Sequence, residues 1–232
     1  MLEERGTPTV AIAIARGQAE RTRPPRALFV PFQLGRPMGH PGDAAFQRRV
    51  LLAALGLLER TDGPVILADH AEEDPNWQDT PGWAPPLPAA TAPFSVAGFG
   101  AELAALRPAW ARAQARYGGR TTVGLAGQAP EAWPAFAAAV LAGGLPSVAL
   151  HQTTALAVRF LCDDIKAMYG EAAAADGAPP SARQADQWFW RQTQAGALLL
   201  ALRDVAMASD NNALKTVGGR FFVPAPWLPA AG

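Results

Sequence analysis

The segment Ala27–Phe32 constrains the fold more than any other feature, because its apolar character is almost unbroken. A strand of this kind is typically buried on both faces of a parallel sheet. A loop rich in glycine and proline follows it, then a helix for which Asp43 is the expected N-cap, and then a short apolar strand at Val65–Leu67. This order of strand, loop, helix and strand predicts a parallel crossover unit.

Two further features support this first unit. The β-prone segment Pro8–Ile14 predicts an additional strand upstream. In the helix after Asp43, apolar residues recur at helical spacing, so one face should be buried against the sheet. We expect that buried stripe to contain Phe46, Val50, Ala54, Leu55 and Leu58.

The middle of the chain suggests a second crossover unit. Residues 121–126 and 147–150 have the composition of strands, and a helix is expected between them from Pro130 to about Leu141. The segments Gly6–Ile12 and Gly144–Leu150 also share one pattern, in which a glycine is followed by a proline and an apolar strand. We therefore expect the same local structure at both places.

The last third is expected to be helical. One helix should begin at Thr153 or Thr154 and reach about Ala175, and a long helix should open with the capping box at Ser181–Gln184 and end near Ser209. Arg220–Val223 is expected to add a final strand. The predicted fold class is thus α/β, with parallel-sheet strand–loop–helix units and a helical C-terminal third.

The predicted organisation has three parts, which are an α/β segment at 1–70, a proline-rich connection at 71–95, and an α/β segment with long C-terminal helices at 96–232. We expect the first and third parts to pack as one compact unit. The connection is either an ordered surface loop or a substrate lid or partner-binding arm, for which Trp77 and Trp83 would supply contacts.

Charge and composition exclude several classes of function. With 20 basic and 20 acidic side chains, the chain has no electrostatic footprint for nucleic acid or an anionic membrane. Every apolar run is too short to span a membrane, and the charged start at Met1–Arg5 does not resemble a secretory signal, so we expect a cytoplasmic protein. Because half of the residues are apolar and only 17% are charged, a homo- or hetero-oligomer is expected.

The loop Gln33–Gly42 is the main candidate for a ligand site. In parallel α/β proteins, ligands bind beyond the carboxyl ends of the strands and beside helix N-termini. Gly35 and Gly39 would let the backbone approach a ligand, the Arg36 guanidinium would grip a carboxylate or phosphate, and His40 would donate to the same anion or move a proton. The alternative is that glycine and proline only shape a tight turn.

Two other histidines also have a functional and a structural interpretation. His151 and Thr153 follow a predicted strand and open a helix, so they would either hold an anion or simply cap the helix. His70, together with Glu72, Glu73 and Asp74, would either bind a cation or form an exposed acidic turn, and the turn is favoured. The three histidines show no metal-ligand spacing, so no metal or cofactor is expected.

The single cysteine, Cys162, excludes an internal disulfide and a cluster of cysteine metal ligands. It lies beside Asp163 and Asp164, and neighbouring carboxylates raise a thiol pKa, which disfavours the thiolate nucleophile. We therefore expect Cys162 to be a buried, unreactive side chain.

The segment Pro24–Asp43, with Phe46, Gln47 and Leu51–Leu58 after it, resembles the glycine/sarcosine/betaine reductase selenoprotein B and D-proline reductase family. The resemblance covers residues 1 to about 68. It implies reductive cleavage of a carbon–nitrogen bond in a small amino acid by a selenocysteine or cysteine. It also supports a substrate site at Gln33, Gly35, Arg36, Gly39 and His40.

The chain departs from the family pattern in one important respect. The family carries its selenocysteine or cysteine in a segment that precedes the match, and this sequence begins after that segment. The loop at 127–130, which would take its place in the second crossover unit, contains no thiol. Either another chain supplies the thiol, or the scaffold serves another purpose.

Three hypotheses follow. The first is an oxidoreductase subunit of the glycine or D-proline reductase type, which binds a small carboxylated or amino-acid-like molecule for thiol-dependent cleavage with a partner chain. The second is a non-catalytic assembly or regulatory subunit on the same scaffold. The third is a lyase or transferase that uses His40 and His151 as acid and base.

Overall fold

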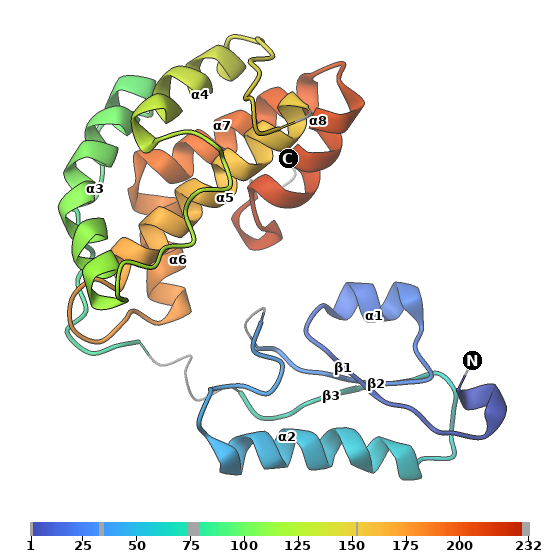
Figure 1. Cartoon of the computed structure of the whole chain (residues 1–232). Helices are drawn as coiled ribbons and strands as arrows, with labels where there is room; N and C mark the ends of the chain where they lie inside the picture. The colour runs from blue at the N-terminus through green and yellow to red at the C-terminus, as the bar shows by residue number, and fades with distance from the viewer. Residues whose placement is uncertain (1, 33–34, 74–78, 152, 229–232) are drawn as a thin grey trace. The chain divides into compact units, whose positions relative to one another are not determined.

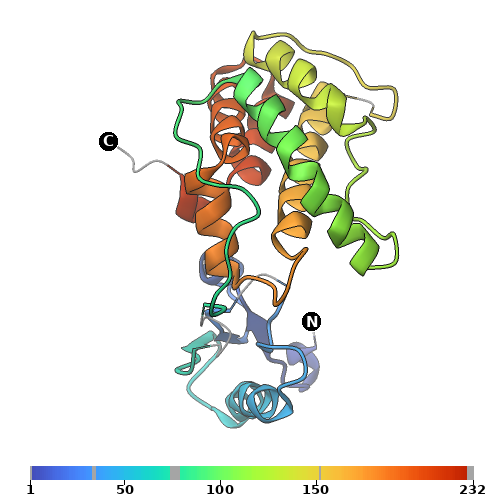
Figure 2. The same cartoon turned by 90° about the vertical axis from the view of Figure 1, so that its left-hand side faces the viewer.

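The computed structural model describes residues 2–32, 35–73, 79–151 and 153–228. The chain forms two compact units, Met1–Asp79 and Thr80–Gly232. The first contains a three-stranded parallel sheet with interleaved helices, and the described part of the second is helical (Figures 1 and 2). This architecture confirms the predicted α/β class with a helical C-terminal region.

The sheet of the first unit contains β1 (Ala11–Ala13), β2 (Arg26–Phe29) and β3 (Ile66–Asp69), in the spatial order β1-β2-β3. Both pairings are parallel, and Ala27 in the central strand lies opposite Ala11 and Leu67. Ala27 and Leu28 point to opposite faces and are both buried. The central strand is therefore covered on both faces, as its apolar sequence predicts.

Two helices connect these strands and lie on opposite faces of the sheet (Figure 1). They are α1 (Arg16–Thr22), between β1 and β2, and α2 (Ala44–Gly56), between β2 and β3. A 3-10 turn, η1 (Glu3–Arg5), precedes β1, and another, η2 (Leu57–Glu59), continues α2. The carboxylate of Asp43 accepts the Phe46 N–H at 2.9 Å, which confirms the predicted N-cap.

The inner face of α2 packs into the core of this unit, but the predicted stripe was wrong at Leu55. Phe46, Val50 and Ala54 are buried, whereas Leu55 is 43% exposed. Successive residues on a helix are about 100° apart, so Leu55 turns away from the face that Val50 shares with Ala54. The buried core consists of Leu28, Val30, Phe32, Phe46, Val50, Ala54, Leu57 and Ile66.

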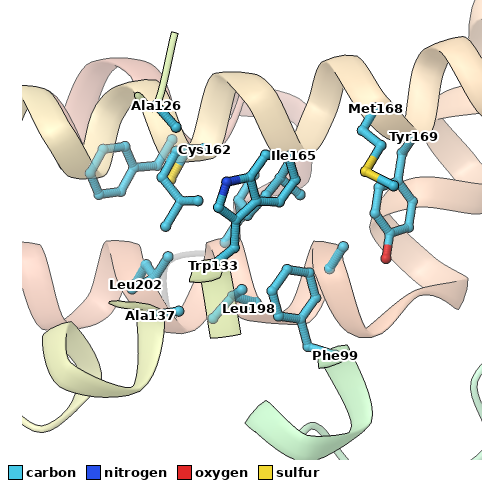
Figure 3. Packing of buried hydrophobic residues seen from close by; sticks show 14 of the residues in the cluster. Phe99, Ala126, Trp133, Ala137, Cys162, Ile165, Met168, Tyr169, Leu198 and Leu202 are labelled. Carbon is cyan, nitrogen blue, oxygen red and sulfur yellow. The ribbon is translucent and has the colours of Figure 1, made fainter. Parts of the chain in front are cut away.

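The second unit is built around three long helices and their shorter neighbours. Its core lies where α5 and α7 face each other, and Figure 3 shows Trp133 of α4 reaching between them, close to Ile165 and Leu198. The elements are α3 (Val96–Arg116), η4 (Pro130–Ala132), α4 (Trp133–Leu141), α5 (Thr154–Ala173), α6 (Ala182–Gln192), α7 (Gln194–Ala208), α8 (Asn212–Val217), the π-helical turn η5 (Gly218–Phe222) and η6 (Ala225–Trp227).

The strand expected at 121–126 is wrong, because its backbone donors bind side chains of α5. The N–H of Thr122 donates to Glu171 at 2.6 Å. Those of residues 124, 125 and 126 donate to the carboxylate of Asp164 at 2.9, 3.0 and 2.8 Å. Strand pairing needs these same donors. The segment is therefore a loop held against α5.

The strand expected at 147–150 is also wrong. The N–H of His151 donates to the Val148 carbonyl at 2.9 Å, which closes a turn, and Leu150, the last residue of the expected strand, is 64% exposed. A buried strand would hide such side chains. The second crossover unit is therefore absent, and the pattern shared with Gly6–Ile12 does not produce the same structure at both places.

The long helix expected from Ser181 is divided at Thr193 into α6 and α7. The predicted capping box of Ser181 and Gln184 is present at the start of α6. Thr193 has extended backbone angles and accepts the Gly196 N–H, so it caps a new helix. Glu102 of α3 stabilises this second start by accepting the backbone N–H groups of residues 194 and 195 at 2.8 and 3.0 Å.

The final strand expected at Arg220–Val223 is wrong as well, since Gly218–Phe222 forms the π-helical turn η5. Phe222 is fully buried. The turn also packs tightly against α7, where a Cβ placed on Gly218 would lie 2.6 Å from the Ala206 Cβ. Burial of Phe222 and this close approach favour continued helical winding over an extended strand.

The Asp164 carboxylate gives a direct test of the loop structure. Asp164→Asn keeps the side-chain size but turns an amide NH2 group towards a backbone N–H, so at least one bond is lost and one buried donor is unsatisfied. We expect the free energy of unfolding to fall by about 2–3 kcal/mol in urea titrations. Asp163→Asn, whose ion pairs are partly exposed, should cost less than about 1 kcal/mol. Equal losses in both variants would contradict this account.

Candidate functional site

The loop between β2 and α2 leaves the carboxyl end of the central strand, which is where the sequence places a ligand site. Gly35, Arg36 and His40 are exposed, and Gly39 is buried. Gln33 lies outside the described residues. The structure therefore brings four of the predicted residues into one short segment next to the start of α2.

Glycine conformation and packing shape this segment. Gly35 and Gly39 have φ angles of 87° and 76°, which side chains rarely adopt. The N–H of Gly39 donates to the Arg36 carbonyl at 3.0 Å. A Cβ on Gly39 would lie 2.4 Å from the Phe46 ring, so only glycine fits there. This contact supports a structural role for Gly39 as the residue that packs the loop on α2.

His40 is attached to α2 through its backbone and leaves its side chain exposed. Its carbonyl accepts the side-chain amide of Gln47 at 2.8 Å and the N–H of Asp43 at 3.3 Å. No hydrogen bond or ring contact engages the imidazole within the part of the chain that the structure describes. A ligand at the imidazole would therefore displace no partner among these residues.

Arg36 differs from the neighbouring arginines because its guanidinium has no partner among the described residues. At the same edge of the sheet, Arg16 contacts Asp69 and bonds Glu20 at 3.1 Å, and Arg49 binds Glu72 at 2.8 Å. Among residues 2–32 and 35–73, no hydrogen bond or ion pair engages the Arg36 guanidinium. Within those residues, this exposed cation needs to break no ion pair in order to bind an anion.

His70 follows β3 at this edge and packs into the core. Its N–H donates to the Phe29 carbonyl at 2.8 Å, and its ring lies 5.7 Å from the Phe32 ring and 6.1 Å from the Phe46 ring. Glu72 is engaged by Arg49, whose hydrogen bond lowers the pKa of that carboxyl. Asp74 lies outside the described residues. The expected acidic turn therefore contains an ion pair.

His151 and Thr153 belong to the second unit and do not follow a strand, so the strand-end geometry that suggested an anion site is absent. Thr153 caps α5, where its hydroxyl accepts the Leu156 N–H at 3.3 Å. The His151 ring packs against the Phe160 ring in a tilted arrangement, with centroids 5.0 Å apart and an interplanar angle of 32°. Helix capping is therefore the observed role of Thr153, while a ligand role for His151 stays a prediction.

Cys162 is fully buried in the core of the second unit, as predicted. Burial is the main reason that its thiol pKa is raised, and the carboxylate of Asp163 adds to the effect, while Lys166 opposes it. A buried neutral thiol is a poor nucleophile. This side chain is therefore unsuited to the chemistry that the family resemblance implies.

The second unit also contains a cavity of about 150 Å³, beside α5 and α6. Its wall includes Tyr169, Asp186, Phe189 and Trp190, together with neighbouring residues. Burial raises the pKa of the Asp186 carboxyl, and a hydrogen bond from the Trp227 indole partly offsets this shift. The three consecutive aromatic residues of α6, which include Trp188, are all buried, which supports a core-packing role.

The fold and loop define a small parallel α/β unit followed by a helical unit, with a candidate anion site at the carboxyl edge of the sheet. Comparison with family models, curated proteins and solved structures finds no match for this chain. In the described part of the chain, no helix is both long and apolar enough to cross a membrane. Nor does any group of three or more histidine, cysteine or acidic residues there have the arrangement of a metal site.

The two loop glycines provide matched variants for testing the packing of the loop. Gly39→Ala should be destabilised by the positive φ angle and by collision with the Phe46 ring, whereas Gly35→Ala meets nothing within 4 Å. We expect backbone strain to lower the free energy of unfolding by about 1–2 kcal/mol in each variant. Only Gly39→Ala should lose additional stability, from the collision with Phe46. Urea unfolding monitored by circular dichroism measures both. A smaller loss in Gly39→Ala than in Gly35→Ala would contradict the observed packing.

The burial of Cys162 predicts its reactivity. In the native protein, alkylation by iodoacetamide at pH 8 should be at least about a hundredfold slower than for a free thiol, because the thiolate is scarce and shielded. Mass spectrometry gives the rate, and guanidinium chloride should restore full reactivity. Rapid labelling of the folded chain would show instead that the thiol is accessible.

Proposed function

We propose that this chain is a subunit related to the amino-acid reductases, which binds a small carboxylated or amino-acid-like molecule at the loop after β2. A partner chain would supply the thiol chemistry. The observation that carries the proposal is the exposed Arg36 guanidinium, uncommitted among the described residues, at the carboxyl edge of a parallel sheet.

The loop offers a specific arrangement for such a ligand. Arg36 would hold the carboxylate through two parallel N–H···O bonds, which are stronger and more directional than bonds between neutral groups. The exposed imidazole of His40, four residues further on, is the proposed proton donor. Because the Gly39–Phe46 contact fixes the intervening turn, the two side chains emerge from a loop of defined shape.

The reductive step would depend on thiols of another chain, since Cys162 is buried in the second unit. In that reaction, the carbon–nitrogen bond of a protonated amine is replaced by a carbon–hydrogen bond and ammonium leaves. Two thiols of the partner lose two electrons and two hydrogens and become a disulfide. This chain would contribute binding and positioning of the substrate.

A second candidate function is a non-catalytic assembly or regulatory subunit on the same scaffold. Three exposed leucines on α2, at positions 51, 52 and 55, favour it, because contiguous apolar surface marks interaction sites. The third hypothesis, acid–base catalysis by His40 and His151, stays a prediction, and the two histidines belong to different units.

Removal of the guanidinium tests the proposed site. In Arg36→Ala, we expect affinity for the carboxylated ligand to fall about tenfold to a hundredfold, since a hydrogen bond to a charged group contributes about 1.5–3 kcal/mol. Isothermal titration calorimetry with glycine, D-proline and acetate as probes measures the loss. The matched control is Arg23→Ala, which removes an exposed arginine at the opposite edge of the sheet and should leave affinity unchanged.

Two outcomes would contradict the proposal. If none of the three probes binds the wild-type chain, a carboxylate-binding function is rejected. If a probe binds wild type and Arg36→Ala equally well, the ligand site lies elsewhere in the chain.

A further inference from the structure

Helix α2 is apolar on two opposite faces. One face carries Phe46 and Val50 and is buried against the sheet. The other carries Leu51, Leu52 and Leu55, which are 44%, 54% and 43% exposed. A helix that covers a sheet needs only one apolar face, and its outer face is normally polar. The outer leucines are therefore unexplained by the fold of this unit.

The outer leucines lie between two opposite charges. At about 100° per residue, Arg48, Leu52 and Leu55 fall within a narrow stripe along α2. Glu59 follows in the 3-10 turn η2, where about 120° per residue leaves it on the same side of the helix. Arg48 stands near the amino end of this stripe and Glu59 at its carboxyl end, about 18 Å apart along the axis. We call these residues, together with Leu51, the outer stripe.

The charges at both ends of the outer stripe have no partner among the described residues. In the described part of the chain, no hydrogen bond or ion pair engages the side chain of Arg48 or Glu59, and both residues are exposed. The adjacent Arg49, which lies off the stripe, is bound to Glu72. Exposed charges of opposite sign at the two ends of an apolar stripe are a pattern suited to pairing with another surface.

We propose that the outer stripe is the centre of an interface between two copies of this chain, packed antiparallel about a twofold axis. Rotation about an axis midway between Leu52 and Leu55 places Arg48 beside Glu59 of the partner subunit and Leu52 beside Leu55 of the partner subunit. The interface is isologous, because one surface meets itself. Burial of the leucines supplies the apolar contact. The two ion pairs between Arg48 and Glu59 make the two helices run antiparallel.

The order of the residues favours a second copy over an unrelated partner. A positive end, an apolar centre and a negative end are self-complementary when the helix is reversed. A parallel pair would instead bring like charges together at both ends, which is unfavourable. This interface goes beyond the proposed ligand site, since none of its residues belongs to the loop that carries Arg36.

The first experiment tests the apolar centre in the full chain. We expect sedimentation equilibrium to show a dimer for wild type. Leu52→Glu places two carboxylates near the axis and should weaken dimerisation at least about a hundredfold. The matched control is Leu145→Glu in the second unit, where the leucine is also 54% exposed, and this variant should remain a dimer. Circular dichroism checks that each variant folds.

The second experiment reverses the charges. Arg48→Glu and Glu59→Arg should each weaken the homodimer about tenfold or more, because each places like charges at both ends. The double variant should regain dimerisation. An equimolar mixture of the two single variants should form a heterodimer in native mass spectrometry, since one copy then carries two acids and the other two arginines.

Wild type that is monomeric at every concentration accessible to sedimentation would overturn the proposal. So would a dimer unaffected by Leu52→Glu, or a double charge variant no better at dimerising than the single ones. These results are independent of ligand titrations, so failure of the interface is distinguishable from failure of the Arg36 site.

Discussion

Burial of β2 on both faces is the constraint on which the first unit depends. A parallel central strand with apolar residues on both sides requires cover above and below, and α1 and α2 provide it on opposite faces. The connections from β2 to α2 and from β1 to α1 then leave at the same edge of the sheet, because the strands are parallel. The position of Arg36 at that edge follows from this requirement.

In the second unit, the backbone N–H groups of a loop and of a helix start donate to carboxylates on neighbouring helices. These carboxylates take the place that a neighbouring strand would have in a sheet. Asp164 is completely buried and accepts three backbone N–H groups, which offset the cost of removing a carboxylate from water. Glu171 holds the start of the same loop, and Glu102 caps α7. Three acids thus determine where the chain becomes a loop and where a helix restarts.

These acids explain which predictions from sequence hold and which do not. The cap at Asp43 and the capping box at Ser181 depend on residues three positions away, so the sequence alone predicts them. The segment at 121–126 has strand composition, but its acceptor Asp164 lies about 40 residues further on. The helix break at Thr193 likewise depends on Glu102, more than 90 residues earlier. Tertiary partners at such separations override local preference.

At the candidate site, too, the sequence predicts the features that depend on neighbouring residues and misses those that depend on packing. A glycine- and proline-rich loop after a buried strand predicts an exposed Arg36, but the contact of Gly39 with Phe46 depends on packing and was missed. The N-terminus of α2 would contribute little to the proposed anion site, because Asp43 accepts the Phe46 N–H and brings its own negative charge. In the proposed site, the attraction for an anion would therefore rest on the Arg36 guanidinium, and α2 would contribute by holding the loop in shape.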